Sequence, residues 1–207
     1  MQGPDASPLP ILPPHGARQK IGLFGGSVNP AHAAHRLVSL LALRRLALDA
    51  VWWLVTPGNP LKDHTDLAPL AQRMEAAKLV AAHPRIHVTD FESALGSAYT
   101  IDSLTYLKQR SPVARFVWIM GADNLQSFHS WADWREIIRL MPIAVVDRPG
   151  STLSSRHARA ALAFQSAFVA EEHSAHFANR HPPAMIFLHG PRSPLSSTLL
   201  RQAAQPS

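Results

Sequence analysis

Short apolar runs alternate along this chain with longer stretches of helical periodicity. The apolar runs predict six buried β-strands, at residues 21–24, 51–56, 86–89, 115–120, 143–146 and 185–188. Helices are predicted between them, at residues 35–48, 68–82, 101–109, 127–140 and 155–169. This alternation is typical of βαβ units. We therefore predict an α/β fold of the Rossmann-like type, in which an open parallel sheet carries helices on both faces.

The chain length of 207 residues suits one domain with an appendage. Five prolines precede Gly16 and no apolar segment accompanies them, so we predict a disordered leader over residues 1–18. Residues 19–207 are predicted to form a single domain. The alanine-rich stretch after Gly150 has few large apolar residues before Met185, and we expect it to lie at the periphery.

Charge and composition narrow the class of protein. Lys and Arg number 20 against 14 Asp and Glu, a net charge of +6 that favours a polyanionic substrate or partner. The absence of cysteine excludes disulfides, thiolate zinc sites and thiol nucleophiles, and it fits a cytoplasmic location. No apolar stretch reaches the length of a membrane span, so we expect a soluble protein.

The loop after the first strand combines glycines with histidines. Gly25 and Gly26 follow the strand directly, and His32 and His35 fall on one face at the start of the next helix. Glycines permit positive φ angles and let backbone N–H groups approach an anion, which the helix dipole also favours. The spacing fits neither GxGxxG nor a Walker loop. We expect a phosphate cradle; a simple turn with two surface histidines is the alternative.

The last loop carries a second set of anion-binding groups. Ser196, Ser197 and Thr198 are predicted to open a short helix, with Arg201 one turn later. One hydroxyl would serve as a helix cap, and three exceed that need. Hydroxyl donors, N–H groups and an arginine suit the outer phosphates of a nucleoside triphosphate.

Two histidine groups invite a metal interpretation. His32 and His35 could bind zinc, but the glutamate of an HExxH motif and a third ligand are missing. A second group, His173, His176 and His181, lies beside acidic residues in the peripheral stretch, where a solvated helix end is the simpler interpretation. We expect no metal site built from protein ligands.

Six segments complete the pattern in one order along the chain: FGGSVNPAHAAH from Phe24, NPLK from Asn59, YTIDSL from Tyr99, GADNLQSFHSWADW from Gly121, DRPG from Asp147 and SSTLLR from Ser196. Together they resemble the bacterial nicotinate-nucleotide adenylyltransferases of the HxGH nucleotidyltransferase superfamily. One departure is Ala34, which stands where the HxGH motif has glycine.

The resemblance implies transfer of the adenylyl group of ATP to nicotinate mononucleotide, giving nicotinate adenine dinucleotide and pyrophosphate for NAD biosynthesis. It also implies Mg²⁺ bound mainly through the ATP phosphates, small-molecule partners, and neither nucleic acid nor membrane. The implied catalytic residues are His32, His35 and Arg201. The implied ATP-binding residues are Gly25, Gly26, Ser27, Gly121, Asp123, Ser197 and Thr198. The implied mononucleotide-binding residues are Asn29, Lys62, Tyr99, Thr100, Trp131 and Arg148.

Some of these positions have simpler interpretations. Asp123 could be a helix N-cap, Arg148 could pair with Asp147, and Trp134 is expected in the core. The alternative functions are a dual-specificity or pantetheine-phosphate adenylyltransferase, a non-catalytic RNA-binding module, and a zinc hydrolase. The RNA-binding interpretation is weakened because the basic residues are scattered and no aromatic RNA-binding pattern is present.

Overall fold

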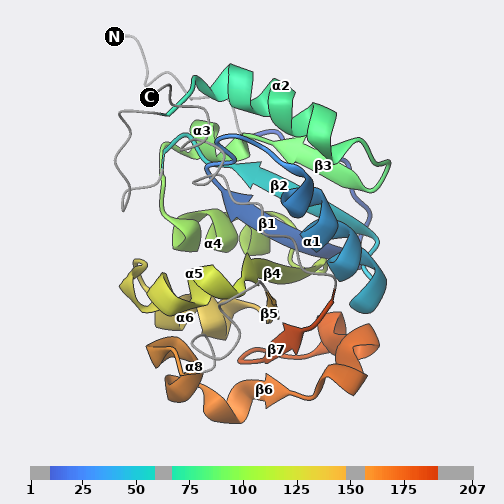
Figure 1. Ribbon diagram of the computed structural model, residues 1–207, viewed down its shortest axis with the longest axis vertical. Coiled ribbons are helices and arrows are strands. Elements are labelled where there is room, and N and C mark those ends of the chain that lie inside the picture. Colours follow the sequence, from blue (N-terminus) through green and yellow to red (C-terminus); the bar gives the residue numbers. More distant parts are fainter. Residues whose placement is uncertain (1–9, 59–66, 148–156, 191–207) are drawn as a thin grey trace, which may run out of the picture.

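The computed structural model describes residues 10–58, 67–147 and 157–190, which form a seven-stranded parallel sheet (Figure 1). The strand order is β3-β2-β1-β4-β5-β7-β6, and every pairing is parallel. The strands are β1 (Lys20–Gly26), β2 (Ala50–Val55), β3 (Ile86–Thr89), β4 (Arg115–Gly121), β5 (Ile143–Val146), β6 (Phe168–Val169) and β7 (Met185–Leu188). The predicted open parallel sheet is confirmed.

Helices cover both faces of the sheet (Figure 1). One face is covered by α1 (Ala33–Arg45), α2 (Leu70–Ala81) and the 3₁₀ helix η3 (Glu171–Asn179). The other is covered by α3 (Phe91–Leu95), α4 (Thr100–Arg110), α5 (Ala122–Ser127), η1 (Phe128–Ser130), α6 (Trp134–Leu140), α8 (Arg159–Ala163) and η2 (Gln165–Ala167). None of the helices within the described ranges is long and apolar enough to cross a lipid bilayer.

Strand β2 illustrates why the chain forms this sheet. All of its residues are buried, because helices cover both faces and strands flank both sides. A strand in that position reads as a continuous apolar run instead of an alternating one. Successive side chains point to opposite faces, so Trp52 packs into one core cluster and Trp53 into the other.

Two predicted helices are wrong in detail. The helix predicted at residues 127–140 is divided into η1 and α6, and the chain turns at Asp133, whose φ is 48°. The described part of the helix predicted at 155–169 consists of α8, η2 and the short edge strand β6. Pairing with β7 overrides the helical pattern there. The stretch between Gly150 and Met185, which was expected at the periphery, contributes the fully buried Phe177 to the core through η3.

Residues 10–18 are packed against the domain, which differs from the disorder predicted for this part of the leader. The Nε2 atom of His15 lies 2.7 Å from Oγ of Ser111, and its ring meets the Trp52 indole edge-on at 5.1 Å. Leu12 packs against the core cluster that contains Trp52. Prolines favour an extended backbone, and that conformation leaves the side chains of this segment able to pack. Residues 1–9 lie outside the described residues.

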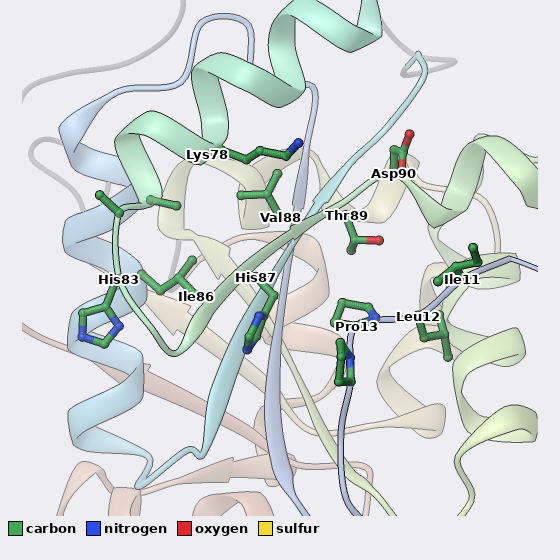
Figure 2. A pocket seen from close by; sticks show the side chains of 13 residues that line it. Ile11, Leu12, Pro13, Lys78, His83, Ile86, His87, Val88, Thr89 and Asp90 are labelled. Atoms are coloured by element: carbon green, nitrogen blue, oxygen red, sulfur yellow. The ribbon is translucent and has the colours of Figure 1, made fainter.

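A cavity of about 530 Å³ lies along the edge strand β3. Figure 2 shows Ile11, Leu12 and Pro13 of the N-terminal segment on one side of it, with His87 of β3 and Lys78 of α2 around the rest. The described lining comes from the N-terminal segment, α2, β3 and the residues that join them. This cavity is therefore separate from the loop that follows β1.

Candidate active site

The winding of the sheet reverses between β1 and β4. The chain runs outward from β1 through β2 to β3, then crosses to the other side of β1 to form β4 and β5. At such a switch point the loops leave the carboxyl ends of adjacent strands in opposite directions and open a crevice for ligands. The loop of residues 27–32 leaves β1 here, and Gly121 ends β4 beside it. We place the candidate active site at this crevice.

The predicted first strand ends at Phe24, whereas β1 continues through Gly25 and Gly26, which pair with Leu54 and Val55 of β2. A Cβ atom on Gly25 would lie 2.3 Å from Cη2 of Trp118, so only glycine fits there. A Cβ on Gly26 would meet nothing closer than the backbone nitrogen of Val28 at 4.0 Å, which leaves room for a ligand. The expected positive φ occurs at neither glycine; it occurs at Val28, with a φ of 48°. The glycines are therefore required for space, and the reversal of the chain falls on a buried β-branched residue.

The rings of His32 and His35 lie against each other at the start of α1, with their planes tilted by 42°. His32 is the N-cap residue and is 6% exposed, and the two ring centroids are 3.8 Å apart. The backbone N–H of His32 donates to Nδ1 of His35 at 3.2 Å. Because Nδ1 accepts this bond, the neutral His35 ring carries its proton on Nε2 as a hydrogen-bond donor. The alternative of two surface histidines is wrong, since one is buried and the other half-buried.

Aromatic rings and a hydroxyl orient His35. Its ring centroid lies 5.8 Å from those of Phe24 and Trp53. The indole of Trp53 donates to Oγ of Ser39 at 2.7 Å, and that hydroxyl donates to the carbonyl of His35 at 2.9 Å. The aromatic rings therefore confine the imidazole, the Nδ1 bond sets its tautomer, and Ser39 holds the backbone of His35.

Arg73 is a site residue that the sequence reasoning did not identify. Its side chain leaves α2 and donates to backbone carbonyls of three separate segments. It is 3% exposed, and burial lowers the pKa of its guanidinium below the ordinary value. An arginine remains charged even so, because a guanidinium holds its proton far more strongly than the other basic side chains do. A buried cation therefore sits directly behind the loops at the carboxyl edge.

A buried carboxylate lies on the other side of the same loops. Glu92 of α3 accepts a hydrogen bond from Oγ of Ser103 at 2.7 Å. Burial raises the pKa of Glu92, while hydrogen bonds with the side chains of Ser103 and Thr56 oppose the shift. Thr56 itself follows β2 and donates its hydroxyl to the carbonyl of Gly58 at 3.0 Å. The second loop is connected to helix α4 through Glu92, which contacts both Thr56 and Ser103.

Tyr99, Thr100 and Trp131 lie on the opposite face of the sheet from α1. Tyr99 is the N-cap of α4 and is half-exposed, and Thr100 is the first helical residue. Trp131 packs edge-on against Trp118 at 6.2 Å and borders the same core cluster as residues of α4. Aromatic and hydroxyl groups are thus available on one side of the crevice.

Other expected positions fall as follows. Asn29 is buried within the first loop. Trp134 is buried in the core as predicted. The N-cap of α5 is Gly121, so the interpretation of Asp123 as the cap is wrong, and it lies in the first helical turn. The expected residues that lie outside the described ranges are Lys62, Arg148, Ser197, Thr198 and Arg201.

The described residues contain no group of three His, Asp or Glu side chains arranged to hold a metal ion. His173 and His176 are exposed on η3, and His181 is exposed just after it. The donors around the first loop are imidazoles, hydroxyls and backbone N–H groups, which suit phosphate oxygens. That donor set fits a divalent cation that is carried by the phosphates of a nucleotide.

Sequence comparison identifies close relatives. The sequence profile of the cytidylyltransferase-like family matches residues 23–203. A probable nicotinate-nucleotide adenylyltransferase of Methylorubrum extorquens is 60% identical over 182 residues, which is 88% of this chain and 98% of the relative. Its counterpart from Rhizobium meliloti is 56% identical over 183 residues, 88% of this chain and 97% of the relative. The similarity spans nearly the whole of both relatives.

Solved structures share the fold. The nicotinic acid mononucleotide adenylyltransferase of Plasmodium falciparum, complexed with NaAD, superposes with a TM-score of 0.68 at 17% identity, covering 89% of this chain and 83% of that one. The same enzyme complexed with APC gives a TM-score of 0.66 at 16% identity and the same coverage. At this level of identity the match speaks for the architecture alone.

Proposed function

This chain belongs to the nicotinate-nucleotide adenylyltransferases of the cytidylyltransferase-like family, and we propose that it transfers the adenylyl group of ATP to nicotinate mononucleotide. The products are nicotinate adenine dinucleotide and pyrophosphate. The observation that carries the proposal is the pair of contacting imidazoles, His32 and His35, at the N-terminus of α1 where the winding of the sheet reverses. Helix dipole, imidazole donors and open space above Gly26 together favour a polyphosphate.

The reaction needs no nucleophile from the protein. An oxygen of the mononucleotide phosphate attacks the α-phosphorus of ATP, and a new P–O bond forms. The bond from that phosphorus to the α–β bridging oxygen breaks, and pyrophosphate leaves with the electron pair. Catalysis of this kind depends on alignment of the reactants and on neutralisation of charge at the non-bridging and leaving oxygens.

The histidine pair is proposed to supply that neutralisation. Nε2–H of His35 would donate to an α- or β-phosphate oxygen, because Nδ1 is engaged by the backbone of His32. His32, Gly25, Gly26 and Ser27 would complete the cradle. Donors fixed before the reaction stabilise developing charge without a reorganisation cost.

Ser197, Thr198 and Arg201 are proposed to bind the β- and γ-phosphates. Mg²⁺ would enter with ATP and stay bound mainly through its phosphates, where it adds positive charge beside the leaving group. Arg148 and Lys62 are proposed to reach the phosphate of the mononucleotide. These five assignments rest on the order and spacing of the motifs.

The two nucleoside ends are proposed to bind on either side of the cradle. Gly121 and Asp123, at the end of β4, would contact the adenosine. Asn29, Tyr99, Thr100 and Trp131 would surround the mononucleotide, with the indole against the pyridine ring. An aromatic face suits an electron-poor ring.

A pyrophosphate-release assay tests the function. Purified protein with MgATP should release pyrophosphate with nicotinate mononucleotide, weakly with nicotinamide mononucleotide and not with phosphopantetheine. Equal rates with the two mononucleotides would indicate a dual-specificity enzyme, and release with phosphopantetheine alone would indicate a pantetheine-phosphate adenylyltransferase.

The proposal includes small-molecule substrates, a cytoplasmic location and no role for nucleic acid. An electrophoretic RNA shift at low salt is the matching test for the binding-module alternative, because non-specific RNA binding is strongest under that condition. A salt-sensitive shift without pyrophosphate release would replace the enzyme proposal with RNA binding.

A further inference from the structure

We propose that Arg73 is a positioning residue for adenylyl transfer: it holds the loop after β1 and the loop after β2 at a fixed separation. This inference rests on the proposed function, because it assigns those loops to the two substrates. Arg73 itself lies behind the loops and is not proposed to contact either nucleotide.

The guanidinium joins segments that are far apart in the sequence. Nη1 donates to the carbonyl of Ser27 at 2.7 Å and to that of Thr56 at 2.8 Å. Nη2 donates to the carbonyl of Pro57 at 3.2 Å, and Nε donates to the carbonyl of Ala68 at 2.8 Å. One nitrogen therefore bridges the first loop and the second loop directly, while the others anchor it to the second loop and to the start of α2.

The side chain that makes these bonds has to be an arginine. A guanidinium offers five N–H donors in a rigid plane, and four of them are used here. A lysine has one nitrogen with three donors and cannot reach carbonyls on both sides of a planar fork. All of the acceptors are backbone carbonyls, so the cluster constrains the course of the loops whatever side chains they carry.

The charge of Arg73 is unusual for a structural residue. Within the ranges that the structure describes, no carboxylate lies at ion-pair distance from this buried guanidinium. Removing a charge from water without a counter-charge is costly, and an apolar side chain of similar volume would serve for packing alone. The guanidinium therefore fixes the backbone of two loops beside the place proposed for a polyanion.

The two loops that Arg73 joins are each connected to residues proposed to bind a substrate. Ser27 precedes the reversal at Val28 and the histidine pair. Thr56 contacts Glu92, which Ser103 binds from the first turn of α4, the helix that begins at Thr100. In-line transfer is sensitive to displacements of about 1 Å between the reacting groups, so the separation of these loops bears directly on turnover.

The test is Arg73→Lys, which keeps the positive charge and loses the planar fork. We expect kcat to fall about tenfold to a hundredfold, with the KM values for ATP and nicotinate mononucleotide within about threefold of the wild-type values. Rates are taken per folded protein, measured by near-UV circular dichroism. The matched control is Arg85→Lys, because Arg85 also donates to a backbone carbonyl, that of Leu48, but at the amino ends of the strands. A wild-type kcat in Arg73→Lys would overturn the proposal.

Chemical rescue separates geometry from charge and from simple stability. In Arg73→Ala, added ethylguanidinium should restore a measurable part of kcat, whereas ethylammonium at the same concentration should not. Equal rescue by both cations would show that charge alone matters and would overturn the positioning role. A variant that loses melting temperature but keeps the wild-type kcat per folded molecule would do the same.

The failure of this proposal can be told apart from the failure of the proposed function. If the wild-type protein releases no pyrophosphate with any of the three substrates, the proposed function fails. Amide hydrogen exchange then tests the bridge between the loops without relying on activity. Arg73→Lys should accelerate exchange of the backbone amides of residues 26–29 together with those of 56 and 58, and Arg85→Lys should not. Exchange that is unchanged, or faster in one loop alone, would overturn the bridging role of Arg73.

Discussion

The two edges of the sheet satisfy their polar groups in different ways. At the carboxyl edge, polar side chains are buried: His32, Arg73 and Glu92 are each nearly inaccessible to water. At the amino edge, exposed side chains bind the strand ends, as Asp49 does when it accepts from the backbone N–H of Lys20 at 2.8 Å, and as Arg85 does toward Leu48. Burying polar side chains costs desolvation free energy, whereas the exposed contacts at the amino edge cost little and can be substituted with little loss of stability.

The contrast between the two edges suggests that one serves catalysis and the other serves stability. A buried polar group costs about 1 to 3 kcal/mol when it is not satisfied, and it interacts more strongly with a ligand because water does not screen it. Surface contacts at the opposite edge contribute little to binding at the crevice. Changes to the proposed substrate-binding groups at the carboxyl edge should therefore alter kinetics, and changes at the amino edge should alter stability alone.

His35→Ala should give the largest effect. Loss of the Nε2 donor removes stabilisation from phosphates that gain charge, so kcat should fall at least about a hundredfold, equivalent to about 2.7 kcal/mol. Steady-state pyrophosphate release measures this, and the exposed His173 provides the control as His173→Ala. Near-normal turnover in folded His35→Ala protein would remove the histidine pair from the mechanism.

The substrate preference should come next in size. A site that binds the pyridine carboxylate through Thr100 and backbone N–H groups disfavours an amide, which brings donors and no charge. Nicotinate mononucleotide should be favoured by about tenfold to a hundredfold in kcat/KM. Thr100→Val should narrow this ratio, while Trp131→Ala should weaken both mononucleotides equally because stacking ignores the substituent. A ratio near one in the wild-type protein contradicts the expectation.

Arg201→Ala should have a comparable or smaller effect, confined to ATP. A charge-assisted hydrogen bond is worth about 1.5 to 3 kcal/mol, so kcat/KM for ATP should fall about tenfold or more. The loss should appear both as a higher KM for ATP and as a lower kcat. Arg110→Ala, at the exposed end of α4, is the matched control. If the affinity for the mononucleotide changed and the kinetics with ATP did not, Arg201 would belong to the mononucleotide site instead of the ATP site.

His15→Ala tests the amino edge. Loss of the bond with Ser111 should cost about 1 kcal/mol, which lowers the melting temperature by about 2 to 4 °C in a domain of this size. Kinetic constants should not change. Truncation of residues 1–9 is the comparison, and the melting temperature should stay at the wild-type value. A kinetic defect in His15→Ala would erase the distinction between the edges.

Glu92→Gln should give the smallest effect, visible as a pH dependence of stability. Burial raises the pKa of Glu92 in the folded protein above its unfolded value, so the ionised form is destabilising at neutral pH. This penalty disappears as the pH falls through the folded pKa towards the unfolded value. Relative to the wild type, Glu92→Gln should be more stable at about pH 7 and lose that advantage towards pH 4, as measured by urea unfolding. A difference that does not vary with pH would contradict the expectation.

The strands could be predicted from sequence because a parallel sheet buried on both faces requires continuous apolar runs. The interruptions could not be predicted. The apolar residues Phe128, Trp134 and Ile137 fit one continuous helix in the sequence. The helix is nevertheless interrupted between Phe128 and Trp134, because Asp133 adopts a positive φ. The edge strand β6 has two residues and exists because β7 lies beside it.

The candidate site divides in a similar way. His32 and His35 could be found because a glycine-rich turn before a helix has a recognisable spacing. Arg73 could not, because its surroundings in α2 resemble those of a surface arginine and its partners are backbone carbonyls. A carbonyl is common to every residue, so no pattern of side chains in the sequence reports such a contact.

The close packing of Trp118 on Gly25 limits which substitutions the sequence can accept at these two positions. A Cβ at position 25 would occupy the space that the indole already fills, with 2.3 Å to Cη2 and 3.1 Å to Cζ2. Position 25 can accept alanine only after position 118 has become smaller, and the order of the two substitutions is thereby fixed. The end of β1 is thus constrained from inside the core, and homologous chains should show the two positions varying together, if they vary at all.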